Sequence, residues 1–191
     1  MKYKNMNVIG YRRSGTHYVT AALSKNFFNE DEYLKYYQKH KIPNQFNFKN
    51  DTAYICVKRN FEDIAKSIFK MRKRFGLKKD NFDKFLMTPY NKMWNSNVGK
   101  FSVKVETLTN QKIVSKVGGG LKSINLIPRK HWGQYYISWM KIENARNNVK
   151  IVNYEDFVED FDGTMSKMAD FFGSDKKEFI NIEKKVGWTP L

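Results

Sequence analysis

Residues suited to binding an anion follow the first apolar run of the chain, 8–10, and precede a second apolar run, 18–23. They comprise two arginines, two hydroxyl residues, a glycine and a histidine: Arg12, Arg13, Ser14, Gly15, Thr16 and His17. This order predicts a strand, a tight loop and a helix. The first N–H groups of a helix have no partner within it, and the helix dipole is positive there, so such a loop favours an anionic group. We therefore expect a phosphate-like or sulfate-like ligand near residues 12–17.

The glycine spacing tests whether this loop belongs to a nucleotide kinase. Gly10 and Gly15 are separated by five positions, as in a Walker A loop. That motif also needs Lys followed by Ser or Thr, which reach the terminal phosphates and hold magnesium. Thr16 and His17 occupy those two places. The sequence disfavours a metal-dependent kinase, and a P-loop-like kinase stays an alternative.

The elements that must position this loop alternate between strand and helix. Besides the first strand and its helix, 6–27, apolar runs predict strands at 54–57 and 149–154. Helical spacing of apolar residues predicts helices from Phe61, within 80–95 with a break at Pro89, over 129–147, and over the segment that ends at Gly173. Strand–helix units in this order predict an α/β fold, a parallel β-sheet flanked by helices, with the ligand at the carboxyl ends of the strands.

Length and composition fit a single domain spanning 1–191, since one core usually serves a chain of this size. Cys56 is the only cysteine and lies inside an apolar run, which indicates a small buried core residue. No stretch approaches the about 18 consecutive apolar residues of a membrane span. We expect a cytoplasmic protein without a membrane span.

The charge of the chain favours anionic partners. Its 35 Lys and Arg residues outnumber 19 Asp and Glu residues, for a formal net charge of +16. Such a field attracts nucleotides, nucleic acid, acidic glycans or acidic membrane surfaces, and does not choose among them. A nucleic-acid-binding protein is therefore an alternative function.

Two stretches carry a resemblance to a known family. The loop Tyr-Arg-Arg-Ser-Gly-Thr at 11–16 resembles the Tyr-Pro-Lys-Ser-Gly-Thr loop of sulfotransferases that use 3′-phosphoadenosine 5′-phosphosulfate (PAPS). The resemblance implies that this loop holds the 5′-phosphosulfate in a P-loop-like three-layer fold. Residues 54–67 are similar to the family's strand, Arg-Asn/Asp-Pro-x-Asp, helix and Ser, which implies that Arg59 and Ser67 bind the 3′-phosphate.

A third stretch extends the resemblance, and three positions depart from it. Residues 149–157 and 171–173 resemble the family's strand-Tyr-Glu-Asp-Leu segment and its Phe-Leu-Gly helix end. Arg13 stands where the family often has lysine, and Phe61 where it has proline. The family's C-terminal Arg-Lys-Gly-x-x-Gly-x-Trp loop is matched only in part, at residues 183–188. The resemblance makes Lys184 and Lys185 candidate phosphate contacts.

The resemblance implies a PAPS-dependent sulfotransferase, whose base is often a histidine in a Lys-Thr-His-Leu-Pro pattern. His40, within Lys-His-Lys-Ile-Pro, resembles it with the histidine one place earlier, so His40 is either the base or a surface histidine among lysines. Arg13 would stabilise the leaving group. His17 either hydrogen-bonds the phosphosulfate, or caps the helix or packs.

Several properties of the reaction are left open at this point. The three histidines are dispersed and show no metal-site spacing, so we expect no metal. The acceptor, a small molecule or a glycan, is not readable, and residues 28–50 and 76–130 are expected to shape its site. A relative that binds the nucleotide but has lost transfer is a further alternative.

Overall fold

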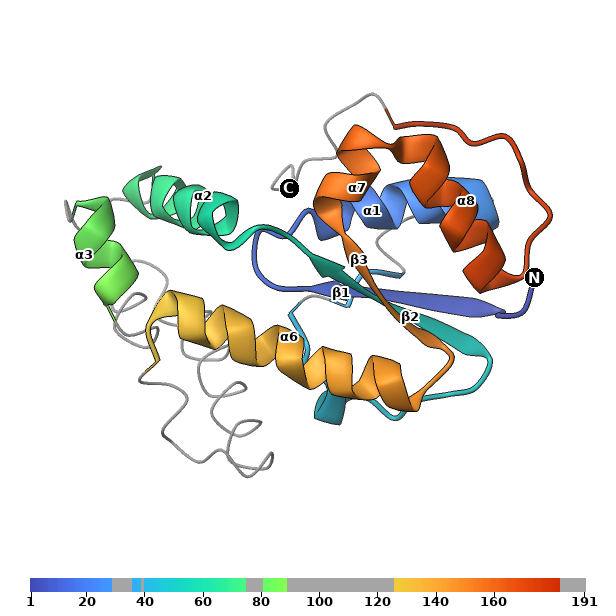
Figure 1. Cartoon of the computed structure of the whole chain (residues 1–191), viewed down its shortest axis with the longest axis horizontal. Helices are drawn as coiled ribbons and strands as arrows, with labels where there is room; N and C mark the ends of the chain where they lie inside the picture. The colour runs from blue at the N-terminus through green and yellow to red at the C-terminus, as the bar shows by residue number, and fades with distance from the viewer. Residues whose placement is uncertain (29–35, 39, 75–80, 89–125, 183–191) are drawn as a thin grey trace. The chain divides into compact units, whose positions relative to one another are not determined.

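The structure is a computed structural model, which describes residues 1–28, 36–38, 40–74, 81–88 and 126–182 (Figure 1). The chain divides into two compact units. The first unit contains Met1–Lys41, Asn47–Asn60 and Trp139–Leu191, and the second contains Ile42–Phe46 and Phe61–Ser138. The single-domain organisation expected from the length stays a prediction.

The first unit is built on a parallel three-stranded sheet of order β1-β2-β3. Its strands are β1 (Asn5–Gly10), β2 (Thr52–Lys58) and β3 (Val149–Asn153). Gly10 is paired with Val57, and Val57 with Val152, so the three strands end level with one another. The parallel sheet expected from the sequence is confirmed, and the loops that follow the strands meet at its carboxyl edge.

One face of the sheet packs on helices α1 (Thr16–Leu23) and α8 (Phe161–Phe172). Side chains alternate along a strand, so Val8, Ile55 and Val57 share this face. They form one buried cluster with apolar residues of the two helices, Val19, Leu23, Met165, Met168 and Phe172. Burial of these side chains is the main stabilising term of the unit.

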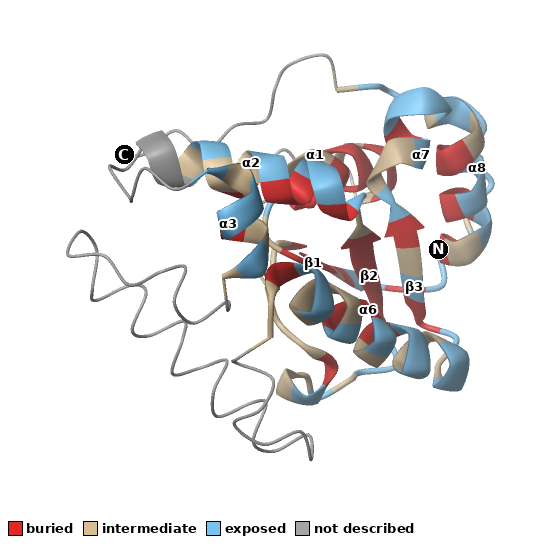
Figure 2. Ribbon diagram, turned by 60° about the vertical axis from the view of Figure 1, so that its left-hand side comes forward, coloured by how far each residue is buried: buried red, intermediate tan, exposed pale blue. Residues whose placement is uncertain are grey.

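The opposite face carries Ile9, Tyr54 and Cys56, all of which are buried. Here Phe48 bridges the sheet and helix α6 (Pro128–Ala145), with its ring centroid 4.7 Å from Tyr54 and 6.3 Å from Trp139. The prediction of a core role for Cys56 is confirmed, because burial is complete and raises the pKa of the thiol. Figure 2 shows the buried residues gathered on the strands and on the inward sides of the helices.

The second unit contains η3 (Pro43–Gln45), α2 (Phe61–Arg74), α3 (Phe82–Met87) and the first part of α6. Ile64 and Ile68 of α2 are buried, as the spacing from Phe61 predicts. The Phe69 ring lies 5.4 Å from Phe82 and 5.3 Å from Phe85, which joins α2 to α3. Helix α6 begins and ends within two residues of its predicted bounds.

The segment after β3 forms two helices, where the sequence predicts one. Short helix α7 (Tyr154–Glu159) ends at Asp160, and α8 begins directly after it. The Asp160 side chain accepts a hydrogen bond of 3.1 Å from Gly163 N, which starts the second helix at that residue. Gly173 ends α8 in the left-handed conformation, as predicted.

Beyond α8 the chain returns along α1. Helix α1 continues into a π-helical turn, η1 (Ser24–Phe28), in which Asn26 is buried. The Asn26 side chain donates to Ile180 O at 2.9 Å and accepts from Ile180 N at 2.8 Å. Tyr18 in the first turn of α1 donates to Asn181 Oδ1 at 2.9 Å. Among the described residues, no helix is long and apolar enough to span a membrane.

Candidate functional site

The loop of residues 11–15 connects β1 to α1 through two left-handed residues. Arg13 has φ of 65° and Gly15 has φ of 85°, and Ser14 N donates to Tyr11 O at 3.1 Å. Two glycines make this path possible. A Cβ on Gly10 would overlap the side chains of Ser14 and Thr16, and a Cβ on Gly15 would overlap the Tyr154 ring. The loop therefore closes tightly over the end of β1.

One buried hydroxyl of the loop has no hydrogen-bond partner among the described residues. Ser14 is fully buried, and no atom of the described residues hydrogen-bonds its hydroxyl. Helix α1 has no side chain capping its N-terminus and no acidic residue in its first turn. A buried hydroxyl without a partner and a helix N-terminus without a cap are costly unless a ligand or water bonds them. Both features fit an anion.

Arg59 follows β2 and contacts this loop directly. Its Nη1 donates to Arg13 O at 3.3 Å, and its guanidinium carbon lies 4.6 Å from the centre of the Tyr154 ring. The Arg59 Nε atom is buried, and the part of the chain that the structure describes offers it no hydrogen-bond partner. The loop of residues 11–15 and Arg59, which the sequence predicts to bind phosphate groups, are thus in contact at the carboxyl edge of the sheet.

The start of α7 contacts both the loop of residues 11–15 and the residues that follow β2. Tyr154 packs against Gly15 on one side and Arg59 on the other. The Glu155 carboxylate accepts a hydrogen bond of 2.8 Å from Asn60 N. The residues after β3 therefore fix the relative placement of the loops after β1 and β2.

A third segment, containing residues 36–38 and 40, lies along the other side of β1. Tyr37 forms a parallel bridge with Val8, and Gln38 N donates to Val8 O at 3.0 Å. The His40 Nδ1 atom lies 2.9 Å from Gly10 O. Because a carbonyl oxygen only accepts, Nδ1 carries a proton here, and in the neutral imidazole Nε2 then holds the lone pair. The structure thus places His40 beside the end of β1, and its role as the base stays a prediction.

His17 in the first turn of α1 packs against Tyr37, with ring centroids 4.5 Å apart. Burial, and secondly the charge of Arg13, lower the pKa of His17 below its ordinary value of 6.5. Burial raises the pKa of Tyr37, against smaller opposing effects of a hydrogen bond with Thr16 and of the charges of Arg12 and Arg13. At neutral pH both rings are uncharged, although they lie beside two guanidinium groups.

The structure does not test the remaining predicted site residues. Ser67 lies in α2 of the second unit, so its convergence with Arg59 stays a prediction. Lys184 and Lys185 lie outside the described residues. His131, which is not among the predicted site residues, is in the first turn of α6. The part of the chain that is described contains no group of three His, Cys, Asp or Glu residues able to hold a metal ion.

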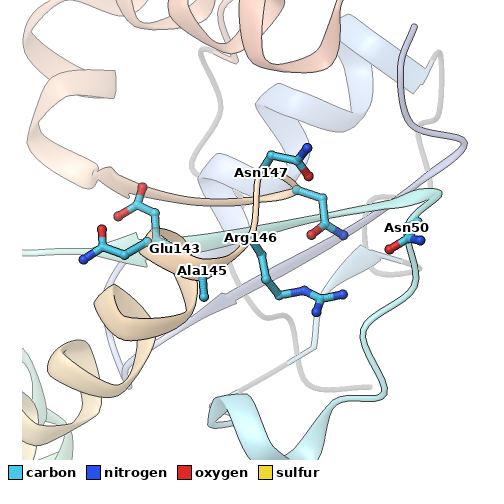
Figure 3. A pocket seen from close by; sticks show the side chains of 7 residues that line it. Asn50, Glu143, Ala145, Arg146 and Asn147 are labelled. Carbon is cyan, nitrogen blue, oxygen red and sulfur yellow. The ribbon is translucent and has the colours of Figure 1, made fainter.

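A pocket of about 570 Å³ lies at the amino edge of the sheet, where β2 and β3 begin (Figure 3). Seven residues line it, and four of them are asparagines: Asn50, Glu143, Asn144, Ala145, Arg146, Asn147 and Asn148. The Arg146 guanidinium lies 4.9 Å from the centre of the Phe48 ring. This pocket is at the opposite end of the strands from the loop of residues 11–15.

Most of the buried polar groups around this pocket are used by the fold. The buried Asn148 amide donates to Lys49 O at 2.8 Å and to Thr52 O at 2.9 Å. The Glu143 carboxylate accepts from Ile151 N at 2.9 Å. These bonds join the start of β2 and of β3 to their neighbours, which is a structural role.

A family model described as "Sulfotransferase domain" matches residues 37–186. The match covers more than half of the chain, which therefore belongs to the sulfotransferase domain family. This confirms the family expected from the sequence motifs. The match begins at Tyr37 and does not include the loop of residues 11–15, whose role as a binding site stays a prediction.

Two solved structures show the same fold. One is a mouse sulfotransferase, SULT7A1, complexed with PAP, at 16% sequence identity and a TM-score of 0.55, where the alignment covers 91% of this chain and 60% of that one. The other is a retinol dehydratase in a complex with retinol and PAP, at 14% identity and a TM-score of 0.55, covering 92% and 62%. This chain spans about 60% of their length. No curated protein sequence matches the chain.

Proposed function

We propose that this protein is an enzyme that transfers a sulfuryl group from PAPS to a hydroxyl or amine of an acceptor. The observation that carries the proposal is the contact between the loop of residues 11–15 and Arg59 at the carboxyl edge of the sheet. Family membership supports the reaction class. The PAP in both similar structures supports the nucleotide.

The residues fit a donor with phosphate at two ends. The loop and the first turn of α1 would hold the 5′-phosphosulfate through Arg12, Arg13, Ser14, Gly15, Thr16 and His17. The buried Ser14 hydroxyl, which has no hydrogen-bond partner among the described residues, supports an anion held by the loop at the start of α1. Arg59 would bind the 3′-phosphate, together with Ser67 of α2 and with Lys184 and Lys185. A guanidinium suits this task because it donates to two oxygens of one phosphate.

The chemistry needs a base and a group that stabilises the leaving phosphate. PAPS, when bound, supplies a sulfuryl group on a phosphate leaving group. His40 Nε2 would take the proton of the acceptor hydroxyl or amine, while Nδ1 stays bonded to Gly10 O. Arg13 is exposed and lies near His17 and Tyr37, where it would stabilise charge on the bridging oxygen. The reaction is proposed to need no metal, because His17 stands where a Walker A loop has its magnesium-binding hydroxyl.

The acceptor is proposed to be a small molecule or a glycan. The retinol in the retinol dehydratase structure supports a small molecule. A cytoplasmic location is part of the proposal and is compatible with the lack of a spanning helix among the described residues.

Thermal stabilisation by adenosine 3′,5′-bisphosphate (PAP), compared with ATP and AMP, tests the nucleotide. A ligand held only by the folded state stabilises it by about 2.7 kcal/mol at 100 times its Kd. We expect PAP to raise Tm most, because AMP lacks a 3′-phosphate. Equal shifts with all three nucleotides, or a magnesium-dependent preference for ATP, would contradict the proposal.

Transfer itself is tested with labelled PAPS and a panel of acceptors. His40→Ala should abolish transfer and leave PAP affinity unchanged, since His40 is proposed to act on the acceptor. Binding of PAP without transfer to any acceptor would indicate a relative that has lost activity. Salt-sensitive binding to polynucleotides, with no response to PAP, would indicate the nucleic-acid-binding alternative.

A further inference from the structure

Arg13 has a backbone conformation that arginine rarely adopts. Ser14 N donates to Tyr11 O at 3.1 Å, so residues 11–14 form a β-turn with Arg13 as its third residue. Its φ is 65°, and among the described residues no other residue except glycine has a positive φ. Turns with a positive φ at the third residue favour Gly or Asn there. An L side chain in this conformation is strained, and it persists only where neighbouring groups hold it.

Arg59 contacts this strained residue directly. Its Nη1 donates to Arg13 O at 3.3 Å. The second left-handed residue of the loop, Gly15, lies against the Tyr154 ring, and the centre of this ring lies 4.6 Å from the Arg59 guanidinium carbon. Arg59 follows β2 and Tyr154 follows β3. The two left-handed residues of the loop are therefore contacted by a pair of side chains from the two neighbouring strand ends.

The Arg59 guanidinium can hold the loop and bind a phosphate at the same time. It carries several N–H donors in one plane, and the bond to Arg13 O uses one of them. The Tyr154 ring contacts the guanidinium and leaves it other donors. The Arg59 Nε atom is buried and has no hydrogen-bond partner among the described residues. A single side chain can therefore connect the loop of residues 11–15 to a phosphate bound at Arg59.

We propose that Arg59 is a positioning residue for the loop of residues 11–15, in addition to its proposed role as a phosphate ligand. Its bond to Arg13 O stabilises the left-handed conformation of Arg13, and with it the loop conformation that binds the 5′-end of the nucleotide. This inference rests on the proposed function. Coupling between two binding events is reciprocal, so the 3′-phosphate and the 5′-phosphate each strengthen the binding of the other.

The decisive experiment compares Arg59→Met with the wild type on two ligands, PAP and AMP, which differ only in the 3′-phosphate. A residue that bound the 3′-phosphate alone would not affect AMP. Loss of one hydrogen bond typically changes an equilibrium constant by about 3- to 10-fold. We expect Arg59→Met to weaken AMP by this factor, measured by calorimetry, and to weaken PAP more. Unchanged AMP binding would show that the positioning role is wrong. If the wild type does not prefer PAP to AMP, the proposed function fails, which is a different result.

Arg146→Met is the matched control. The Arg146 guanidinium also lies over an aromatic ring, 4.9 Å from the centre of the Phe48 ring, at the opposite edge of the sheet. Its loss removes the same charge, and the binding of both nucleotides should be unchanged. An equal loss of AMP affinity in Arg146→Met and Arg59→Met would indicate a general effect of charge and would overturn the positioning role.

A double-mutant cycle with Arg13→Gly separates the hold on the backbone from the nearby charge of Arg59. Glycine adopts a positive φ without strain, so the loop needs less support in Arg13→Gly. Arg59→Met should therefore weaken AMP by a smaller factor in the Arg13→Gly background than in the wild-type background. The same factor in both backgrounds would contradict the proposal.

Amide hydrogen exchange tests the same bond without any nucleotide. The Ser14 N–H group bonds Tyr11 O and closes the turn that contains Arg13. Its exchange should be about 3- to 10-fold faster in Arg59→Met than in the wild type, and unchanged in Arg146→Met. Equal exchange rates in Arg59→Met and the wild type would overturn the positioning role, whichever nucleotide the protein prefers.

Discussion

The two edges of the parallel sheet use polar residues in opposite ways. At the amino edge, the buried Asn148 amide and the Glu143 carboxylate bond backbone groups of β2 and β3. At the carboxyl edge, the described residues offer the buried Ser14 hydroxyl no partner, and among them the Arg59 side chain donates one hydrogen bond, of 3.3 Å, to Arg13 O. A polar pocket alone is therefore a poor sign of function in this fold. Buried polar groups that the fold does not use are a better one.

The comparison has one exception that makes it testable. Arg146 at the amino edge resembles Arg59, because each guanidinium lies over an aromatic ring and each has a buried Nε atom without a partner in the described part of the chain. They differ in their surroundings. Arg59 adjoins the N-terminus of α1, which has no side-chain cap, whereas Arg146 adjoins amides that already bond the sheet.

The largest expected effect is on the free energy of unfolding, when a glycine near each edge of the sheet is replaced by alanine. Gly15 and Gly173 both have positive φ, and alanine there costs about 1–2 kcal/mol. An added Cβ on Gly15 would also overlap the Tyr154 ring, which adds about 1–3 kcal/mol for overpacking, whereas on Gly173 it would lie 3.3 Å from Lys2 Cβ. In urea unfolding, Gly15→Ala should lose more stability than Gly173→Ala. Equal losses would show that the carboxyl-edge loop is not tightly packed.

The next effect is on ligand affinity, for the two arginines. A hydrogen bond to a charged group contributes about 1.5–3 kcal/mol, so Arg59→Met should weaken PAP binding by about 10- to 100-fold. Arg146→Met should leave PAP binding unchanged, because Arg146 belongs to the opposite edge. Calorimetric titration of both variants measures the difference. Similar losses in the two variants would remove the distinction between the edges.

The smallest effect is a pH dependence of stability at the carboxyl edge. The unfolded chain protonates His17 near pH 6.5, whereas burial and Arg13 lower the pKa in the folded protein. Between these two values the unfolded chain binds more protons, so stability falls as the pH falls below about 6.5. Plots of Tm against pH should be flatter for His17→Gln than for the wild type, with His131→Gln as the control. Parallel plots for His17→Gln and the wild type would mean that His17 is not buried as described.

Much of the fold could be predicted because its signals are local. The apolar run 54–57 lies within β2, which is buried along nearly its whole length, as expected for the middle strand of a covered parallel sheet. Gly173 ends α8 where the helical spacing stops. The bounds at α7 and α8 were missed because Asp160 starts a new helix through one side-chain bond, and the apolar spacing does not record that.

The candidate site was predicted in part. The loop motif and Arg59 could be found because their residue types follow strands directly. Tyr37 could not, since its link to β1 is one bridge between residues far apart in the chain and leaves no periodic pattern. The geometry that places Tyr154 on Gly15 and Arg59 likewise depends on contacts between separate strand ends.

Strand β2 has a partner on each side and helices over each face, so its amide hydrogens should exchange with solvent only when the whole unit unfolds. Arg59 follows this strand directly, and its backbone is fixed before any nucleotide arrives. Immobilising an interface side chain on binding costs about 0.5–1.5 kcal/mol of free energy. The Arg59 side chain is already held by the Tyr154 ring and by Arg13 O, so much of this cost is absent when a ligand binds. Binding of a nucleotide by Arg59 should therefore change the local dynamics of this residue little.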